Sequence, residues 1–312
     1  MKKPRILVVR GGAIGDFIMT LPAVGALRER WPDGHIEILG YPHIIELARG
    51  RYYADATRSI DAKPMAGFFI PNAVLDPGLM EYFGGFNVVV SYLFDPDSIF
   101  ANNVRACGVK QVIEASPRPK DAHAAVHYCR PLESLAIYVD EPRPRIHPSE
   151  SDRDAASKFL KMVGREPIVA VHPGSGSEKK NWPVEKFTAV ARWVSDELAG
   201  QLLVVQGEAD DHVVKELAKS LEPRPFTVAS GLKLVELAAV LERCALFLGN
   251  DSGITHLAAA VGTPVVAMFG SASLPIWEPR GERVRVVAFS EHDTVNARAA
   301  IEELWGASRA ER

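Results

Sequence analysis

The feature of this sequence that most constrains its fold is the repeated alternation of short apolar runs with helical segments. The apolar runs are rich in Val, Ile and Leu and predict strands, and the first of them is apolar throughout, as in a strand buried on both faces. They comprise residues 6–9, 35–39, 86–92, 111–114, 168–172, 202–206, 226–228, 245–249, 264–269 and 283–288. Strands that alternate with helices form parallel sheets covered on both sides. The chain is therefore predicted to be an α/β protein with doubly wound parallel sheets.

The chain length and one proline-rich segment indicate two domains. A chain of 312 residues exceeds what one hydrophobic core usually organises. Three prolines interrupt regular structure between residues 140 and 152. We therefore expect domains at residues 1–148 and 149–290, facing one cleft, and a helical segment at residues 291–312. Ligands of such sheets bind beyond the C-terminal ends of the strands.

Composition and charge exclude several classes of protein. A formal net charge of −3 is too small for nucleic acid to be the main partner. Residues 1–148 carry 17 Lys and Arg against 16 Asp and Glu, and the rest carries 19 against 23, so the first half suits an anionic partner better. The three cysteines lack metal-ligand or disulfide spacing, which indicates a reducing compartment. With no apolar stretch of membrane-spanning or signal-peptide length, we expect a cytoplasmic protein whose membrane contact, if any, is peripheral.

A glycine turn and a carboxylate follow the first predicted strand. Gly11, Gly12 and Gly15 form the turn, and Asp16 lies at the start of the next predicted helix. The helix dipole and the N–H groups of the first turn favour an ionised carboxylate there. Asp16 is therefore either a simple helix cap or a functional group. The turn lacks the GxGxxG spacing of dinucleotide-binding proteins, so NAD is not favoured as a ligand.

The loop at residues 172–183, HPGSGSEKKNWP, follows a strand of the second half. Its glycines, among them Gly176, allow close approach of a ligand, and its serines, among them Ser175, add hydroxyl donors. Lys180 and a neighbouring lysine supply positive charge. The loop is suited to a phosphate, although it lacks P-loop spacing, and the alternative is an ordinary surface loop with solvated lysines.

A second loop with polar residues opens the segment 250–266. Asp251 or Ser252 can cap the helix that follows, and the N–H groups near Gly253 would form an anion site at the positive end of the helix dipole. His256 lies one turn into that helix. It is either part of this site or a buried structural histidine.

Two acidic segments leave their interpretation open. Glu208 lies in GEADD at another strand end, where a carboxylate can bind ribose hydroxyls or simply begin a solvated helix. Asp95 and Asp97 spell DxD, which can hold a divalent metal on a nucleotide diphosphate. Because Pro96 separates them, a turn is the better interpretation.

A basic cluster lies in the first half. Arg49, Arg51 and Arg58 could bind phosphates of an acceptor, and the alternative is a solvated basic face.

Taken together, three segments resemble glycosyltransferase family 9, the ADP-heptose:lipopolysaccharide heptosyltransferases. They are RGGAIGDFIMTLPAVGALRERWP at residues 10–32, HPGSGSEKKNWPVEKF at 172–187 and GNDSGITHLAAAVGTPVVAMFG at 249–270. The first resembles the R-x-x-x-x-GD start of the family and the last its D-[ST]-G-x-[ST]-H-L-A-A signature. Residues 50–130 differ from the lipopolysaccharide-core enzymes, so the acceptor and the sugar stay open.

The resemblance implies the GT-B fold, with two Rossmann-like domains, the acceptor in the first and the nucleotide-sugar donor in the second. It also implies that the final helix crosses back onto the first domain. By position, Asp16 is the catalytic base and Lys180 contacts the pyrophosphate of the donor. The implied donor-binding residues are Ser175, Gly176, Glu208, Asp251, Ser252, Gly253 and His256. We expect Gly15 and the three arginines to meet the acceptor.

The implied function is an inverting transfer of a heptose-like sugar from an ADP-sugar to a hydroxyl of lipopolysaccharide core or a related glycan. It implies no metal and no cofactor. The acceptor would be an anionic glycolipid or glycan at the inner-membrane surface. Two alternatives remain: a nucleotide-sugar 2-epimerase of similar fold, and a non-catalytic protein that binds sugar nucleotides.

Overall fold

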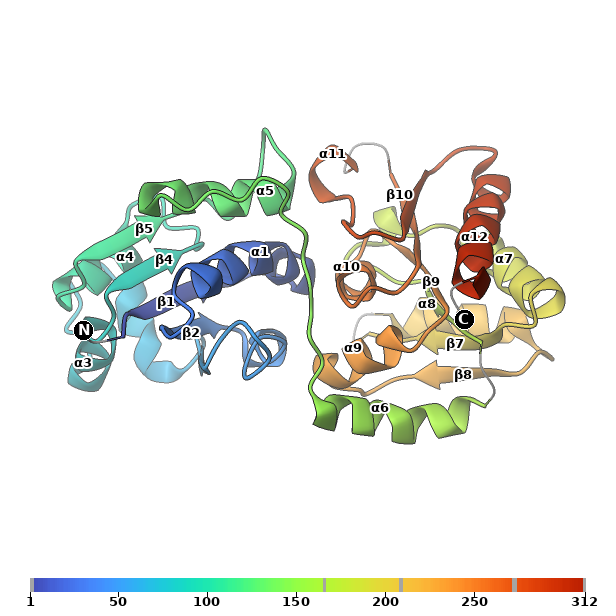
Figure 1. Ribbon diagram of the computed structural model, residues 1–312, viewed down its shortest axis with the longest axis horizontal. Coiled ribbons are helices and arrows are strands. Elements are labelled where there is room, and N and C mark those ends of the chain that lie inside the picture. The colour runs from blue at the N-terminus through green and yellow to red at the C-terminus, as the bar shows by residue number, and fades with distance from the viewer. Residues whose placement is uncertain (1–2, 165–166, 208–209, 271–273, 311–312) are drawn as a thin grey trace. The chain divides into compact units, whose positions relative to one another are not determined.

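Two parallel sheets organise the protein, one in each half of the chain (Figure 1). The computed structural model describes residues 3–164, 167–207, 210–270 and 274–310, with side chains up to residue 307. The chain divides into two units, Met1–Pro144 and Arg145–Arg312. Each unit is described separately below.

The first unit contains, within the described residues, a five-stranded parallel sheet of order β3-β2-β1-β4-β5. Its strands are β1 (Arg5–Arg10), β2 (His35–Gly40), β3 (Ala56–Ser59), β4 (Val88–Ser91) and β5 (Gln111–Glu114). Its helices are α1 (Ile14–Arg30), α2 (Pro42–Ile45), η1 (Lys63–Phe69), α3 (Pro77–Gly84), α4 (Ile99–Ala106), α5 (Ala124–Cys129) and η2 (Arg130–Leu135). In the register, Val8 of β1 pairs with Ile38 of β2 and Val90 of β4.

The core of the first unit has a distinct layer on one face of this sheet. Apolar side chains of η1, α3 and α4 pack there against Leu7, Val9 and Val89. Helices α1 and α5 pack on each other and do not belong to that layer. Residues 17–27 of α1 are buried throughout, as expected of a helix enclosed by its own unit.

The second unit contains, in its described part, a six-stranded parallel sheet of order β11-β10-β9-β6-β7-β8. Its strands are β6 (Ile168–His172), β7 (Gln201–Val205), β8 (Phe226–Ala229), β9 (Leu246–Asn250), β10 (Val265–Phe269) and β11 (Val284–Ala288). Its helices are α6 (Glu150–Val163), η3 (Glu178–Lys180), α7 (Val184–Glu197), α8 (Asp211–Leu221), α9 (Leu234–Glu242), α10 (Gly253–Ala260), α11 (Leu274–Trp277) and α12 (Asp293–Ala310).

Helix α12 belongs to the core of the second unit. Ala297, Ile301, Leu304 and Trp305 join the cluster formed by α7, α8 and one face of the sheet. Figure 1 shows α12 beside α7. Its expected return to the first domain stays a prediction.

Both sheets have the strand order of a Rossmann fold, which confirms the predicted α/β, doubly wound class. In each, the order reverses beside the first strand of the unit: between β1 and β4, and between β6 and β9. Ligands of open α/β sheets bind outside the carboxyl ends of the strands at such a switch point. The loops after β1, β4, β6 and β9 are therefore where a site is expected in each unit.

Candidate active site

Asp16 lies at the switch point of the first unit, in the first turn of α1. The helix begins after Ala13, so Asp16 is its third residue rather than its cap. One carboxylate oxygen, Oδ2, accepts a hydrogen bond from the Ala13 N–H at 3.1 Å. The other, Oδ1, lies 3.0 Å from Nη2 of Arg10 and accepts from the Tyr128 hydroxyl at 3.2 Å. Three donors, from its own helix turn, from β1 and from α5, thus hold the Asp16 carboxylate in one orientation.

Arg10 and Tyr128 were not among the residues proposed from the sequence. Arg10 ends β1, is 3% exposed, and also donates to the Tyr92 carbonyl after β4 at 3.3 Å. Its guanidinium lies 4.5 Å from the centre of the Tyr128 ring. Burial raises the pKa of Tyr128, so its hydroxyl stays protonated as a donor. Tyr128 comes from α5, 112 residues beyond Asp16, and no local pattern in the sequence connects the two.

In the second unit, Lys180 and Asp251 form an ion pair across the switch point. Lys180 Nζ, in η3 after β6, lies 3.0 Å from Oδ2 of Asp251, which follows β9. The lysine side chain is 46% exposed and the aspartate is 6% exposed. The structure thus brings together two of the residues predicted to bind the donor and leaves the ammonium group accessible to a ligand.

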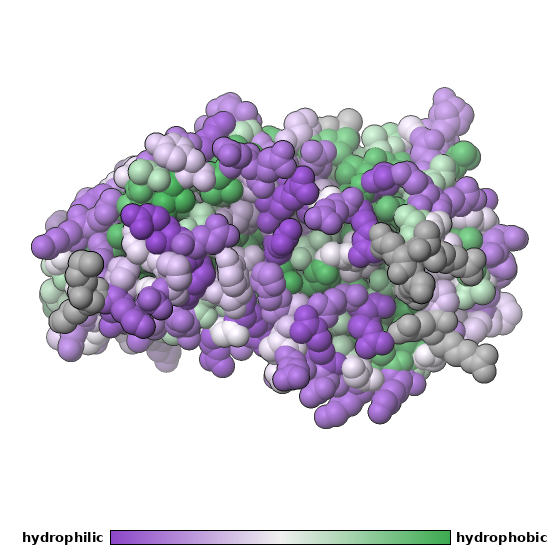
Figure 2. Space-filling model, in the orientation of Figure 1, coloured by the Kyte–Doolittle hydropathy of each residue, from purple (hydrophilic) through white to green (hydrophobic). Residues whose placement is uncertain are grey.

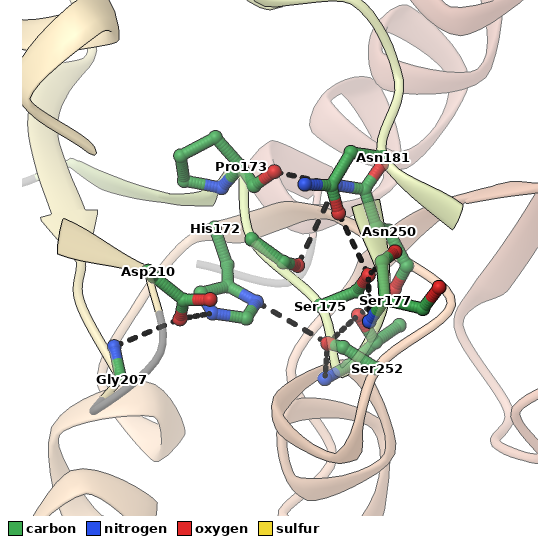
Figure 3. A network of polar contacts seen from close by, with 11 residues as sticks. His172, Pro173, Ser175, Ser177, Asn181, Gly207, Asp210, Asn250 and Ser252 are labelled. Carbon is green, nitrogen blue, oxygen red and sulfur yellow. Dashed lines mark hydrogen bonds and ion pairs between the residues drawn. The ribbon is translucent and has the colours of Figure 1, made fainter. Parts of the chain in front are cut away.

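Asn250 ties the loop after β6 to the end of β9 (Figure 3). Its side-chain oxygen accepts the Trp182 backbone N–H at 2.8 Å, and its amide donates to the Pro173 carbonyl at 2.7 Å. Trp182 is 1% exposed, and its indole N–H donates to Asp293 at the start of α12 at 2.9 Å. These bonds hold the backbone on either side of the lysine in place.

The remaining predicted residues of this loop differ in their surroundings. The Ser175 hydroxyl lies 2.7 Å from Oδ1 of Asn181 and 2.7 Å from the Ser177 carbonyl, so it is engaged within the loop. A Cβ built at Gly176 would meet no heavy atom within 4 Å, which leaves room there for a ligand. Glu208 lies outside the described residues.

Helix α10 begins at Gly253, and Ser252 is its cap. The Ser252 hydroxyl oxygen accepts the Thr255 N–H at 3.3 Å, and this arrangement points the first N–H groups of the helix outward from its end. His256 is 4% exposed within the same helix. Free N–H groups at a helix start can bind an anion. The binding roles of Ser252, Gly253 and His256 stay predictions.

His172, at the end of β6, lies between two polar side chains from neighbouring loops (Figure 3). Its Nε2 is 2.8 Å from Oδ2 of Asp210 and its Nδ1 is 3.2 Å from Oγ of Ser252. The Gly207 N–H donates to the same oxygen of Asp210 at 2.9 Å. Burial tends to raise the pKa of Asp210, but the bonds from His172 and Gly207 bring it below its usual value. No local pattern in the sequence predicts this chain of contacts.

The three arginines proposed for the acceptor make local contacts. Arg49 Nε lies 3.5 Å from the Glu46 carboxylate. Arg51 donates to the carbonyls of residues 46 and 49 at 2.9 and 2.8 Å, which fixes the turn after α2. The Arg58 guanidinium lies 3.9 Å from the centre of the Tyr82 ring. Gly15 lies in the first turn of α1. Their contact with an acceptor stays a prediction.

The DxD segment forms a turn. The Asp95 carboxylate accepts the N–H groups of Phe100 and Ala101, at 3.3 and 3.0 Å, and so caps α4. Within the described residues, no group of three or more His, Cys, Asp or Glu side chains is arranged to hold a metal ion. Across that same part of the chain, no helix is long and apolar enough to cross a membrane.

Known proteins share this architecture. The family model of glycosyltransferase family 9 (heptosyltransferase) matches residues 102–303, more than half of the chain. Lipopolysaccharide heptosyltransferase 3 of Escherichia coli is 32% identical over 286 residues, covering 85% of this chain and 83% of that protein. The crystal structure of the glycosyl transferase family 9 protein from Veillonella parvula DSM 2008 matches with a TM-score of 0.82 and 22% identity over 97% of both chains. That of E. coli ADP-heptose lps heptosyltransferase II matches with a TM-score of 0.79 and 16% identity, over 98% of this chain and 99% of that one.

The two Rossmann-like domains, shared with these structures, define a protein of the GT-B fold. The sequence matches identify it more closely. The chain belongs to glycosyltransferase family 9, the heptosyltransferases.

Proposed function

We propose that this protein is an inverting lipopolysaccharide heptosyltransferase that moves a heptose-like sugar from ADP-heptose to a hydroxyl of lipopolysaccharide core or a related glycan. The observation that carries the proposal is the Asp16 carboxylate, held by Arg10, Tyr128 and the Ala13 N–H at the switch point of the first sheet. The relatives named for lipopolysaccharide and for ADP-heptose support the acceptor and donor classes.

In the proposed reaction Asp16 is the general base. The acceptor hydroxyl gives its proton to the carboxylate while its oxygen attacks the anomeric carbon of the donor. The bond from that carbon to the diphosphate breaks on the opposite face, and the electron pair leaves with ADP, so the configuration is inverted. A general base must be held within reach of the hydroxyl that it deprotonates, and the three donors around Asp16 hold its carboxylate in place.

The second unit supplies stabilisation for the leaving diphosphate. Lys180 presents an accessible ammonium group, and the start of α10 presents N–H groups at the positive end of the helix dipole. We place the diphosphate between these two features. The list of residues proposed to surround the donor comprises Ser175, Gly176, Glu208, Asp251, Ser252, Gly253 and His256.

The remaining parts of the proposal concern the domains and the acceptor. Residues 1–148 would bind the acceptor and residues 149–290 the donor. Gly15, Arg49, Arg51 and Arg58 would contact the acceptor. The enzyme would work in the cytoplasm, at the surface of the inner membrane, without a metal or a cofactor.

Replacing the base tests this mechanism. Asp16→Asn keeps the size of the side chain but cannot accept a proton, so kcat should fall by about 10²- to 10⁴-fold, the usual contribution of a general base. Binding of ADP, measured by thermal shift, should be unchanged. Asp76→Asn is the matched control, because Asp76 caps α3 in the same unit and asparagine caps equally well. Full transfer activity in Asp16→Asn would overturn the mechanism.

Three further measurements test the donor, the reaction type and the absence of a metal. Thermal shift should favour ADP over UDP, GDP and NAD, since only a bound ligand raises the melting temperature. The donor should stay unchanged when it is incubated without an acceptor; its conversion to an epimer would favour an epimerase. Transfer should persist in EDTA, and its loss would contradict a metal-independent reaction.

A further inference from the structure

His172 occupies a place that the proposed mechanism does not use. It is 2% exposed and contacts two loops other than its own, through Asp210 at the start of α8 and Ser252 at the start of α10 (Figure 3). Ser252 caps the helix whose N-terminus is the proposed diphosphate site. The imidazole therefore lies one hydrogen bond away from a group that would touch the ligand.

Asp210 fixes the orientation of the imidazole. Its Oδ2 accepts from Nε2 of His172 at 2.8 Å and from the Gly207 N–H at 2.9 Å. An ionised aspartate can only accept, so Nε2 carries a hydrogen and Nδ1 faces Ser252. A Cβ at Gly174 would collide with the Asp210 carboxylate, so the backbone after β6 is shaped around this pair.

The hydroxyl of Ser252 has one proton and a choice of acceptors. Its oxygen already accepts the Thr255 N–H at 3.3 Å. When His172 is neutral, Nδ1 is an acceptor at 3.2 Å and can take the Ser252 proton. When His172 carries a second proton, Nδ1 becomes a donor to the Ser252 oxygen, and the hydroxyl proton must point elsewhere. Nearby, Oγ1 of Thr255 lies at 3.1 Å, with its own proton donated to the Asn250 carbonyl.

We propose that His172 is a positioning residue for the donor diphosphate: binding of the diphosphate brings a proton from solvent onto Nδ1 of His172, which turns the Ser252 hydroxyl proton toward a phosphate oxygen. This inference rests on the proposed function. The proton balance is complete, because one proton leaves the solvent for the imidazole and the Ser252 proton changes only its acceptor.

Charge supplies the driving force. A nucleoside diphosphate brings two to three negative charges into a partly buried site, and a nearby imidazolium offsets part of that cost. Among the described residues, Asp210 is the acidic group bonded to His172, and its carboxylate would pair with an imidazolium. On the α10 side, Asp251, paired with Lys180, precedes Ser252 in the chain, and His256 is a second buried histidine.

The test is calorimetric titration of the full-length protein with ADP at pH 7.5 in Hepes and in Tris, buffers with different ionisation heats that carry no phosphate. An ordinary imidazole, with a pKa of about 6.5, is mostly neutral at this pH. We expect the wild type to take up a substantial fraction of a proton per ADP. His172→Asn should lose this uptake and bind ADP about tenfold more weakly. His212→Asn, which removes an exposed histidine of α8, should change neither quantity.

A measurement on the wild type alone guards against a variant that fails to fold. From pH 7 to pH 9 the affinity for ADP should fall by up to tenfold per pH unit while the site titrates. A flat profile, or equal proton uptake in the wild type and in His172→Asn, would overturn the inference and leave the proposed function standing. If the wild type does not bind ADP, the proposed function and this inference both fail.

Discussion

Asp16 and Asp76 both lie at the starts of helices of the first unit, Asp16 in the first turn of α1 and Asp76 as the cap of α3, but their carboxylates are held differently. Asp76 accepts a backbone N–H of its own helix at 2.9 Å. Asp16 accepts from its own turn and also from Arg10 and Tyr128, which come from a strand end and from another helix. A cap needs no such fixation, because its role is completed within the first turn. The contacts of Asp16 restrict the direction of its carboxylate, as a base that must meet one hydroxyl requires.

The Tyr128 hydroxyl should therefore matter to the rate. Tyr128→Phe removes the bond to Oδ1 of Asp16, and we expect kcat to fall about tenfold, since a hydrogen bond to a charged group is worth about 1.5–3 kcal/mol. Tyr92→Phe is the control: its hydroxyl donates to the Tyr128 carbonyl at 2.6 Å and does not reach Asp16. It should cost about 1 kcal/mol of stability and leave kcat near that of the wild type. Steady-state kinetics with unchanged kcat in Tyr128→Phe would argue against this role.

What could be predicted of the site depends on where its partners lie in the sequence. Asp16, Lys180 and Asp251 were proposed because each follows a predicted strand within a few residues and has glycine or serine close by. The contacts of His172 and Tyr128 span 38 to 112 residues, so only the folded strand order brings their partners together. Their roles in catalysis and binding stay predictions that the proposed variants test.

At the scale of elements, apolar runs in the sequence predicted strands correctly, whereas a strand with a polar sequence was missed. Every strand that carries Val, Ile or Leu was predicted, because these residues mark a strand even where, as in β5, β8 and β11, it is only partly buried. Strand β3 was missed, since its sequence ATRS is polar and lies at an exposed sheet edge. Helices α3 and α4 have only eight residues each, too short for a clear period. The segment HIIELARG at residues 43–50 predicts a helix of about two turns. The structure has the shorter helix α2, Pro42–Ile45, followed by turns.

Asp293 joins the start of α12 to the loop that carries Lys180. Burial tends to raise the pKa of Asp293, but hydrogen bonds from Lys186, Trp182 and the Ser290 N–H lower it. Because the folded pKa lies below the unfolded one, this carboxylate stabilises the protein above about pH 4, and the contribution is lost as the pH falls through the folded value.

Asp293→Asn should therefore cost about 1–3 kcal/mol at pH 7, the range for hydrogen bonds to a charged group. The deficit should shrink as the pH approaches 3, which urea unfolding at both pH values would measure. Asp196→Asn breaks an exposed pair with Arg224 and should change stability less, because solvent screens that pair. A deficit in Asp293→Asn that is independent of pH would contradict the role given to its charge.

Two glycines should respond in opposite ways to alanine. Gly306 lies in α12, where a Cβ would meet no heavy atom within 4 Å, so Gly306→Ala should stabilise by about 0.5–1 kcal/mol through helix propensity. At Gly40, the end of β2, a Cβ would collide with the Arg10 carbonyl and lie 2.6 Å from Ile45. Gly40→Ala should destabilise and disturb the strand that carries Arg10. Thermal unfolding of both variants checks this, and a stabilised Gly40→Ala would show that the β1–β2 spacing can relax.

At the scale of the whole molecule, the family model matches the two units to different extents. The family model begins at residue 102, inside α4, and continues through β11 into α12. It therefore matches the sheet of the second unit completely and only β5 of the first. Because the second unit is the one proposed to bind the donor, the donor class is easier to assign by similarity than the acceptor class. In Figure 2, polar and apolar side chains are intermixed on the face shown.

Hydrogen exchange with and without ADP should show this division directly. We expect protection in residues 172–183 and 250–260, where the proposed diphosphate site lies, and little change in residues 5–30. Ligand binding suppresses local opening of the segments it contacts, which makes exchange the appropriate measurement. Protection confined to the first unit would place the nucleotide on the wrong sheet and refute the proposed donor site.

The chain passes between its units at Pro144, in a stretch without helix or strand, and each unit closes its own sheet on either side. The coding sequence therefore divides at this point into two segments that can be exchanged separately. Under the proposed roles of the two units, a hybrid that keeps residues 145–312 and takes its first half from another family member would retain its sugar donor and inherit a new acceptor. In evolution and in protein engineering alike, recombination at this boundary is then a direct route to new glycans made from an existing activated sugar.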